Sequence, residues 1–260
     1  MAILLKTKDD IEIMREGGKR HAEILRALGE MVEPGMSALV LEEEALRLVR
    51  AHGDTPAHLN YTPHGAKRPF PAALCISVND EIVHGIPNEK EKIFKQGDLV
   101  SIDLSIKHRG LITDSAITVA VGAIDDESKK LLEVTKKALN AGIKVAKAGN
   151  HVGDIGEAIN KVIEASGFSI ADDLAGHGVG FELHEEPYVP NIGLAGEGDE
   201  LVPGMVIAIE PMVNVGGPEI VDSDDGYTIK TSDGSNSAHF EHTVAITEKG
   251  NIILTSTSEE

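Results

Sequence analysis

The chain has 260 residues, of which 41% are hydrophobic and 26% charged, a composition typical of a globular protein with a sizeable core. Its net charge of −19 argues against charge-driven binding of nucleic acid. No apolar stretch approaches the ~20 residues of a membrane span, and residues 1–8 lack the apolar core of a signal peptide. The single cysteine, Cys75, excludes a disulfide framework, so we expect a reducing compartment, most simply the cytoplasm.

Hydrophobic periodicity and turn residues predict helices alternating with groups of strands. In the first half of the chain we expect helices over residues 9–31 and from Ser37 to Gly53, and strands over 74–78, 99–106 and 111–121. In the second half we expect a helix over 128–147, another that ends before Gly167, and strands over 205–210, 227–230 and 241–247. Thr7 and Asp10 resemble a capping box before the first helix.

Glycines that end the predicted helices recur with a fixed offset. Gly35 and Gly149 are 114 positions apart, and so are Gly53 and Gly167. Two helices followed by strands therefore occur twice, in the same order. We expect one domain built from two similar halves, about 1–124 and 125–260, packed around a pseudo-twofold axis. The fold class is then α+β with a mainly antiparallel sheet.

An acidic residue ends a matching strand in each half. Asp103 lies six residues after Gly97, and Glu210 lies six residues after Gly204. A carboxylate at the end of an apolar strand is out of place unless it has a partner. A pseudo-twofold arrangement would bring Asp103 and Glu210 toward the same axis.

A second aspartate follows Asp103 on the predicted hairpin. If His108 and Arg109 form the turn, Asp114 lies directly opposite Asp103, with Cβ atoms ~4.5–5.5 Å apart. Two buried like charges at that distance would need a shared proton or a divalent cation between them. The alternative is a pair of solvated aspartates on an outer face, and the spacing alone does not decide between them.

Further candidate ligands stand in glycine-rich segments or against apolar neighbours: His84, His177, His184, Glu210 and Glu241. If Asp103, Asp114, His177, Glu210 and Glu241 meet, they offer four carboxylates and one imidazole, a set that suits hard or borderline divalent ions. Four negative charges match two such ions, which would lower the pKa of a bridging water. The residues thus predict a two-metal hydrolase.

Several segments resemble the signature segments of type I methionine aminopeptidases. They are residues 75–79, 83–87, 176–187, 210–212 and 240–243, together with the spacing of Asp103 and Asp114. The resemblance covers essentially the whole chain. It implies the pita-bread fold and removal of the initiator methionine from nascent polypeptides.

The resemblance also implies a role for each site residue. Asp103 would bind one ion, Asp114 and Glu241 would bridge two ions, and His177 and Glu210 would complete the two ligand shells; Co²⁺, Mn²⁺, Fe²⁺ and Zn²⁺ all suit these ligands. Glu210 would take a proton from the bridging water, and the resulting hydroxide would attack the substrate. His184 would stabilise the oxyanion and His84 would hydrogen-bond the scissile amide nitrogen.

The methionine pocket would be formed by Tyr61, Phe70, Cys75 and Tyr227. In this region the sequence departs from the family pattern, because the connection from Tyr61 to Phe70 is longer than in most bacterial members. Leu183 stands where Phe is typical, and Tyr227 where Trp is common. The expected substrates are peptides that begin with Met and a small second residue. We expect a monomer that contacts the ribosome only transiently.

Three alternatives compete with this interpretation. An Xaa-Pro peptidase shares the fold, but such chains usually carry an additional N-terminal domain. A catalytically silent peptide-binding module would have lost metal ligands, whereas this sequence retains all five. A two-metal phosphoesterase fits the ligand types, but the sequence lacks a phosphate-cradling Gly-Lys motif.

Overall fold

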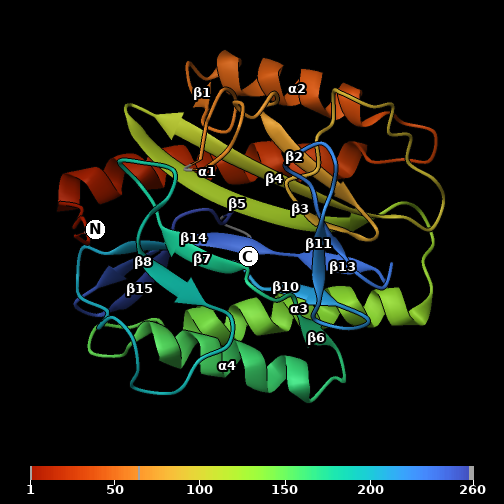
Figure 1. Ribbon diagram of the computed structural model, residues 1–260. Helices are drawn as coiled ribbons and strands as arrows, with labels where there is room; N and C mark the ends of the chain where they lie inside the picture. Colours follow the sequence, from red (N-terminus) through yellow and green to blue (C-terminus); the bar gives the residue numbers. More distant parts are fainter. Residues whose placement is uncertain (1, 64, 258–260) are drawn as a thin grey trace.

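The computed structural model describes residues 2–63 and 65–257, and these form four helices around a large curved sheet (Figure 1). The helices are α1 (Lys8–Met31), α2 (Ala38–Ala51), α3 (Asp126–Val145) and α4 (Val152–Glu164). In Figure 1, α1 and α2 lie above the sheet, and α3 and α4 lie below it. All four predicted helices are therefore confirmed, with ends close to those expected from periodicity.

The strands are all paired antiparallel. In the first half of the chain they are β1 (Thr55–Pro56), β2 (Leu74–Val78), β3 (Glu81–Val83), β4 (Leu99–His108) and β5 (Leu111–Ala120). In the second half they are β6 (Ser169–Ile170), β7 (Ala175–Gly178), β8 (Glu185–Pro190), β9 (Val206–Ile209), β10 (Met212–Asn214), β11 (Ile220–Asp222), β12 (Ile229–Thr231), β13 (Ser237–His239), β14 (Glu241–Thr247) and β15 (Gly250–Ile253). The predicted α+β class is confirmed.

The large sheet carries both groups of strands. Among the described residues it has nine strands in the order β1-β4-β5-β14-β9-β7-β8, with β2 on β4 and β15 on β14. Two three-stranded sheets, β13-β10-β6 and β11-β12-β3, complete the fold. The predicted strand over 227–230 is displaced in the structure, because Ile229–Thr231 forms the pairing with β11 and β3.

The helices bury their apolar faces in two cores. Leu28 of α1 and Leu41 of α2 belong to one core, whereas Leu131 of α3 and Ile159 of α4 belong to the other. Ile117 of β5 packs against both cores. Because burying one such side chain contributes about 1.5–3 kcal/mol, these faces hold the helices on the sheet.

Local interactions fix the helix ends. Thr7 and Asp10 form the predicted capping box, in which Thr7 Oγ1 accepts from the Asp10 amide at 3.1 Å and Asp10 Oδ2 accepts from the Thr7 amide at 2.9 Å. The Ser37 hydroxyl caps α2 by accepting from the Leu39 amide. None of the helices in the described part of the chain combines the length and hydropathy needed to cross a membrane.

The glycines of the sequence repeat adopt equivalent backbone conformations. Gly35, Gly53, Gly149 and Gly167 have φ values of 90°, 77°, 87° and 82°, which L-residues rarely adopt. Isolated antiparallel bridges also join Ser37 to Ile93 and His151 to Glu200, just before α2 and α4. On these grounds we propose that residues 1–124 and 125–260 are the two related halves of one domain.

The register of the β4–β5 hairpin differs from the predicted one. His108 pairs with Leu111, so the turn residues are Arg109 and Gly110, with φ values of 48° and 92°. A two-residue turn with positive φ at both positions matches the twist of the strands, and glycine suits its second position. Ser105 therefore lies opposite Asp114, and Asp103 lies opposite Ala116. The prediction that the two aspartates face each other directly was wrong by two residues, but both stay on one face.

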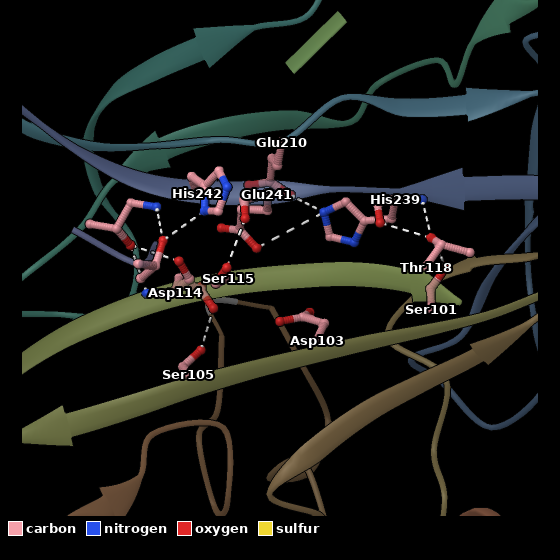
Figure 2. Close-up of polar contacts among 12 residues, drawn as sticks. Ser101, Asp103, Ser105, Asp114, Ser115, Thr118, Glu210, His239, Glu241 and His242 are labelled. Atoms are coloured by element: carbon pink, nitrogen blue, oxygen red, sulfur yellow. Dashed lines mark hydrogen bonds and ion pairs between the residues drawn. The ribbon is translucent and has the colours of Figure 1, made fainter. Parts of the chain in front are cut away.

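Side-chain hydroxyls join β5 to β13 and β14 along the seam between the two groups of strands. Thr243 Oγ1 accepts from the Asp114 amide at 2.8 Å and donates to the Asp114 carbonyl at 2.7 Å. Ser115 Oγ donates to the Glu241 carbonyl at 2.7 Å, and Thr118 Oγ1 donates to the His239 carbonyl at 2.8 Å (Figure 2). The backbones that carry Asp114 and Glu241 are thus held together from both sides of the seam.

Candidate active site

All predicted site residues line one cavity of about 410 Å³. They are Tyr61, Phe70, Cys75, His84, Asp103, Asp114, His177, His184, Glu210, Tyr227 and Glu241. They come from both groups of strands, because Asp103 and Asp114 lie on β4 and β5, His177 on β7, and Glu241 on β14. The convergence on which the metal hypothesis depends is therefore present in the structure.

The acidic side chains surround His177 closely. His177 Nε2 lies 3.4 Å from Glu210 Oε1 and 3.8 Å from Asp114 Oδ2. Single ligand atoms of Asp114, His177 and Glu241 all lie within 4.8 Å of one another. Figure 2 shows Asp103 on the same hairpin as Asp114, and both side chains line the cavity.

Burial and mutual repulsion strongly perturb these carboxylates. Burial, with the nearby Glu210 charge, raises the pKa of Asp114 to about 8, and burial raises the pKa of Glu210 to about 7. The pKa values of Asp103 and Glu241 are raised well above their usual range by burial and by the neighbouring carboxylates. The protein itself supplies little compensation, since no lysine or arginine in the described part of the chain lines the cavity.

Divalent cations fit this donor set. Asp103 Oδ1 and Glu241 Oε1 are buried and have no hydrogen-bond partner among the described residues. Buried, unpaired carboxylate oxygens are costly unless a cation compensates them. Carboxylate oxygens with imidazole nitrogen suit borderline ions such as Mn²⁺, Fe²⁺, Co²⁺ and Zn²⁺.

His239 is a candidate ligand that we did not predict. Its Nε2 is buried without a hydrogen-bond partner in the described residues and lies 3.5 Å from Glu210 Oε2 and 4.0 Å from Glu241 Oε2. Glu210, His239 and Glu241 form a second group whose ligand atoms lie within 4.8 Å of one another. Because His239 stands two residues before Glu241, strand alternation could have indicated that both face the same side.

Two further histidines border the acidic cluster. Burial and the neighbouring His239 and His177 lower the pKa of His84 to about 4, and burial and His84 lower that of His184 to about 4, so both are neutral near pH 7. His84 has φ 58°, an uncommon conformation for a residue with a side chain. The Tyr61 hydroxyl lies 2.9 Å from His184 Nδ1, and the His177 and His184 rings meet edge to face at 4.4 Å.

Beside the acidic cluster the cavity becomes apolar and aromatic. Phe70, Cys75 and Ile86 form a small buried cluster against which Tyr227 packs, with the rings of Phe70 and Tyr227 edge to face at 5.1 Å. The Tyr227 hydroxyl donates to the backbone carbonyl of Arg68, on the long connection between Tyr61 and Phe70. Leu183, by contrast, is buried with Met14 and Val179 in another cluster and does not line the cavity.

Comparison with known proteins identifies the family. The profile of metallopeptidase family M24 matches residues 12–248. The chain belongs to metallopeptidase family M24. It is therefore a metallopeptidase, and the prediction of a divalent-metal hydrolase is confirmed at that level.

The relatives support the resemblance of this chain to type I methionine aminopeptidases. A methionine aminopeptidase of Aquifex aeolicus is 48% identical over 98% of this chain and 99% of its own length. Methionine aminopeptidase 1 of Bacillus subtilis is 43% identical, with 97% and 99% coverage. The resemblance inferred from the sequence is confirmed.

Solved structures support the fold. The crystal structure of methionine aminopeptidase from Thermotoga maritima matches with a TM-score of 0.93 and 42% identity. The match covers 98% of this chain and 100% of the Thermotoga maritima chain. Prolidase from Pyrococcus furiosus matches with a TM-score of 0.75 at 24% identity, covering 98% of this chain and 66% of its own, which indicates a shared fold alone. The predicted pita-bread fold is confirmed.

Proposed function

We propose that this chain removes the N-terminal methionine from nascent polypeptides by hydrolysing the first peptide bond at a dinuclear metal centre. The observation that carries the proposal is the composition of one cavity. Buried carboxylates and imidazoles, with no lysine or arginine among the described residues that line it, lie beside an aromatic pocket. The similarity of this protein to methionine aminopeptidases over nearly its whole length supports the same reaction.

The ligand groups support two ions. The proposed ligands are Asp103, Asp114, His177, Glu210 and Glu241. Glu241 belongs to two groups of closely spaced ligand atoms, one with Asp114 and His177 and the other with Glu210 and His239. Bound there, two divalent ions would supply a bridging hydroxide as nucleophile and polarise the scissile carbonyl. The physiological ion is one of Co²⁺, Mn²⁺, Fe²⁺ and Zn²⁺.

The chain's own residues orient the substrate and move protons. Glu210 is the proposed general base, which accepts a proton from the attacking water at a carboxylate oxygen. If Tyr61 donates to His184 Nδ1, the proton of the neutral ring is on Nε2, where it can be donated to the substrate carbonyl oxygen. His84, neutral and buried, would hydrogen-bond the scissile nitrogen as the amine leaves.

The remaining cavity accounts for the choice of terminal residue. The methionine side chain would pack against Tyr61, Phe70, Cys75 and Tyr227, because a thioether makes favourable contacts with aromatic rings. The free α-amine would lie beside the acidic ligands, which favours cleavage at the chain end. We infer that the substrates are nascent chains with a small second residue, met in the cytoplasm with at most transient ribosome contact. We also infer that the protein acts as a monomer, since one chain supplies all five proposed ligands and the site needs no second copy.

A peptidase assay on the purified chain tests the function. The metal-free protein is reloaded with Co²⁺ or Mn²⁺ and assayed on Met-Ala-Ser, on its Leu and Pro analogues, and on Gly-Pro. We expect metal-dependent release of methionine from Met-Ala-Ser only, and none from Glu210→Gln. Cleavage of Gly-Pro alone would support an Xaa-Pro peptidase, and metal binding without cleavage of any peptide would support a silent binding module.

A further inference from the structure

A buried hydrogen-bond chain leads from His58 to the carboxylate of Asp114. Ser105 on β4 lies opposite Asp114 on β5, and its hydroxyl donates to Asp114 Oδ1 at 2.7 Å. The same hydroxyl oxygen lies 2.7 Å from His58 Nε2. The exposed fractions of Ser105, His58 and Asp114 are 0%, 8% and 4%, so water does not compete for these bonds.

The number of available protons sets the direction of the chain. A serine hydroxyl has one proton, and Ser105 uses it toward Asp114 when that carboxylate is ionised, as it must be to bind a cation. Ser105 Oγ must therefore accept from His58, which places the proton of the imidazole on Nε2. His58 thus donates to Ser105, and Ser105 donates to the carboxylate.

This chain of hydrogen bonds fixes the orientation of the Asp114 carboxylate. With Oδ1 held by Ser105, the second oxygen, Oδ2, lies 3.8 Å from His177 Nε2, toward the other proposed ligands (Figure 2). The backbone of Asp114 is held independently by Thr243 on the other side of the seam. Backbone and side chain are therefore both oriented by the protein alone.

We propose that His58 and Ser105 are positioning residues that preorganise Asp114 for binding the divalent ions. The inference rests on the proposed function of Asp114 as a metal ligand. Partners that orient a ligating carboxylate typically change metal affinity by about 10–100-fold when removed. His58 also packs edge to face on Phe70 at 6.1 Å, so the chain starts at the wall of the proposed methionine pocket.

Two matched pairs of variants separate positioning from a general structural effect. Ser105→Ala removes the donor to Asp114. Its control, Ser101→Ala, also removes a buried hydroxyl from the same face of β4, but this hydroxyl is hydrogen-bonded to Thr118. His58→Leu removes the donor to Ser105, whereas His58→Gln keeps an N–H group at a similar distance from the backbone. The full-length chain is used for each variant.

The test is calorimetric titration of the metal-free proteins with Mn²⁺ or Co²⁺ alone, without peptide. We expect Ser105→Ala and His58→Leu to weaken binding about 10–100-fold, and Ser101→Ala and His58→Gln to stay within about twofold of the parent. Equal affinities in Ser105→Ala and the parent, or equal losses in Ser101→Ala and Ser105→Ala, would overturn the proposal. If the parent itself binds neither ion, it is the proposed function that fails.

Discussion

Lys6 and Glu185 form an ion pair in which both side chains are almost completely buried, with exposed fractions of 1% and 3%. The pair connects the segment before α1 to the end of the loop that carries His184. The other carboxylate oxygen of Glu185 accepts from the amides of Phe181 and Glu182 at 2.6 Å and 2.9 Å. The N-terminal segment therefore supports the shape of a loop at the active site.

Lys6→Met should destabilise the protein by about 3–5 kcal/mol, because it leaves the Glu185 carboxylate buried without its cation. The double variant Lys6→Met/Glu185→Gln should recover part of that loss. Urea unfolding of the metal-loaded protein measures both effects. Lys8→Met, an exposed position two residues away, should change stability by less than about 0.5 kcal/mol, and an equal loss there would contradict the assignment.

The metal-free protein should lose stability as the pH rises from about 7.5 to 8.5. The folded-state pKa values of Asp114 and Glu210, about 8 and about 7, lie above those of an unfolded chain. The folded state then holds more protons than the unfolded state, and this advantage is lost as the pH rises through those values. Above about pH 7.5 the histidines are neutral in both the folded and the unfolded states, because their ordinary pKa is about 6.5, and they contribute little.

Thermal unfolding in chelator and in saturating Mn²⁺ measures this effect. We expect a lower Tm in chelator, and a difference between the two conditions that widens toward pH 8.5, because bound ions compensate the carboxylate charges. A Tm in chelator that rises over this pH range would show that the acidic cluster does not carry the repulsion inferred from its burial.

His84→Ala should lower kcat by about 100-fold or more while KM changes little, since the proposed hydrogen bond to the leaving nitrogen strengthens in the transition state. Steady-state kinetics on Met-Ala-Ser give both constants. Replacement of the exposed His52 by alanine serves as the control. A rise in KM at unchanged kcat would reduce His84 to a binding residue.

Phe70→Ala should act in the opposite way, mainly through binding of the methionine side chain. Loss of one aromatic wall of the Phe70–Tyr227 cluster should cost about 1–3 kcal/mol, or about 5–150-fold in kcat/KM. The comparison of Met-Ala-Ser with a norleucine analogue measures it, and Phe70→Leu should retain more activity than Phe70→Ala. Unchanged kcat/KM in Phe70→Ala would place the methionine pocket elsewhere.

Gly110→Ala should destabilise the β4–β5 hairpin by about 1 kcal/mol, because its φ of 92° is strained for any residue with a Cβ atom, although no atom lies within 4 Å of the added methyl. Denaturant unfolding tests this directly. The matching change Gly29→Ala would add a contact with Ile117 at 2.9 Å instead, and thus separates strain from crowding.

The helices could be predicted from the sequence because their signals are local. Thr7, Asp10 and the glycines at the helix ends act within a few residues of their own positions. The hairpin register could not be predicted as well, since it depends on which residues adopt positive φ, and Arg109 gives no strong signal for that conformation. β7 was also missed, because Gly176 and Gly178 interrupt any apolar pattern and the strand forms only through pairing with β8 and β9.

The candidate site shows the same division between local and distant signals. The five predicted ligands stood out because acidic residues and histidines interrupt apolar or glycine-rich segments. His239 could have been found from its alternation with Glu241. His58 lies in a connection without any periodic pattern, and only its contact with Ser105, 47 residues away, reveals its position.

The seam between β5 and β14 has a consequence for the order of biosynthesis. Asp103 and Asp114 are made early, but Glu241 lies in the last strand that joins the seam, more than 120 residues after Asp114. A growing copy of this chain cannot bring its acidic cluster together until residue 241 has been translated. Under the proposed function, the initiator methionine of a copy that has not reached that point must be cleaved by a copy made earlier or by a different enzyme.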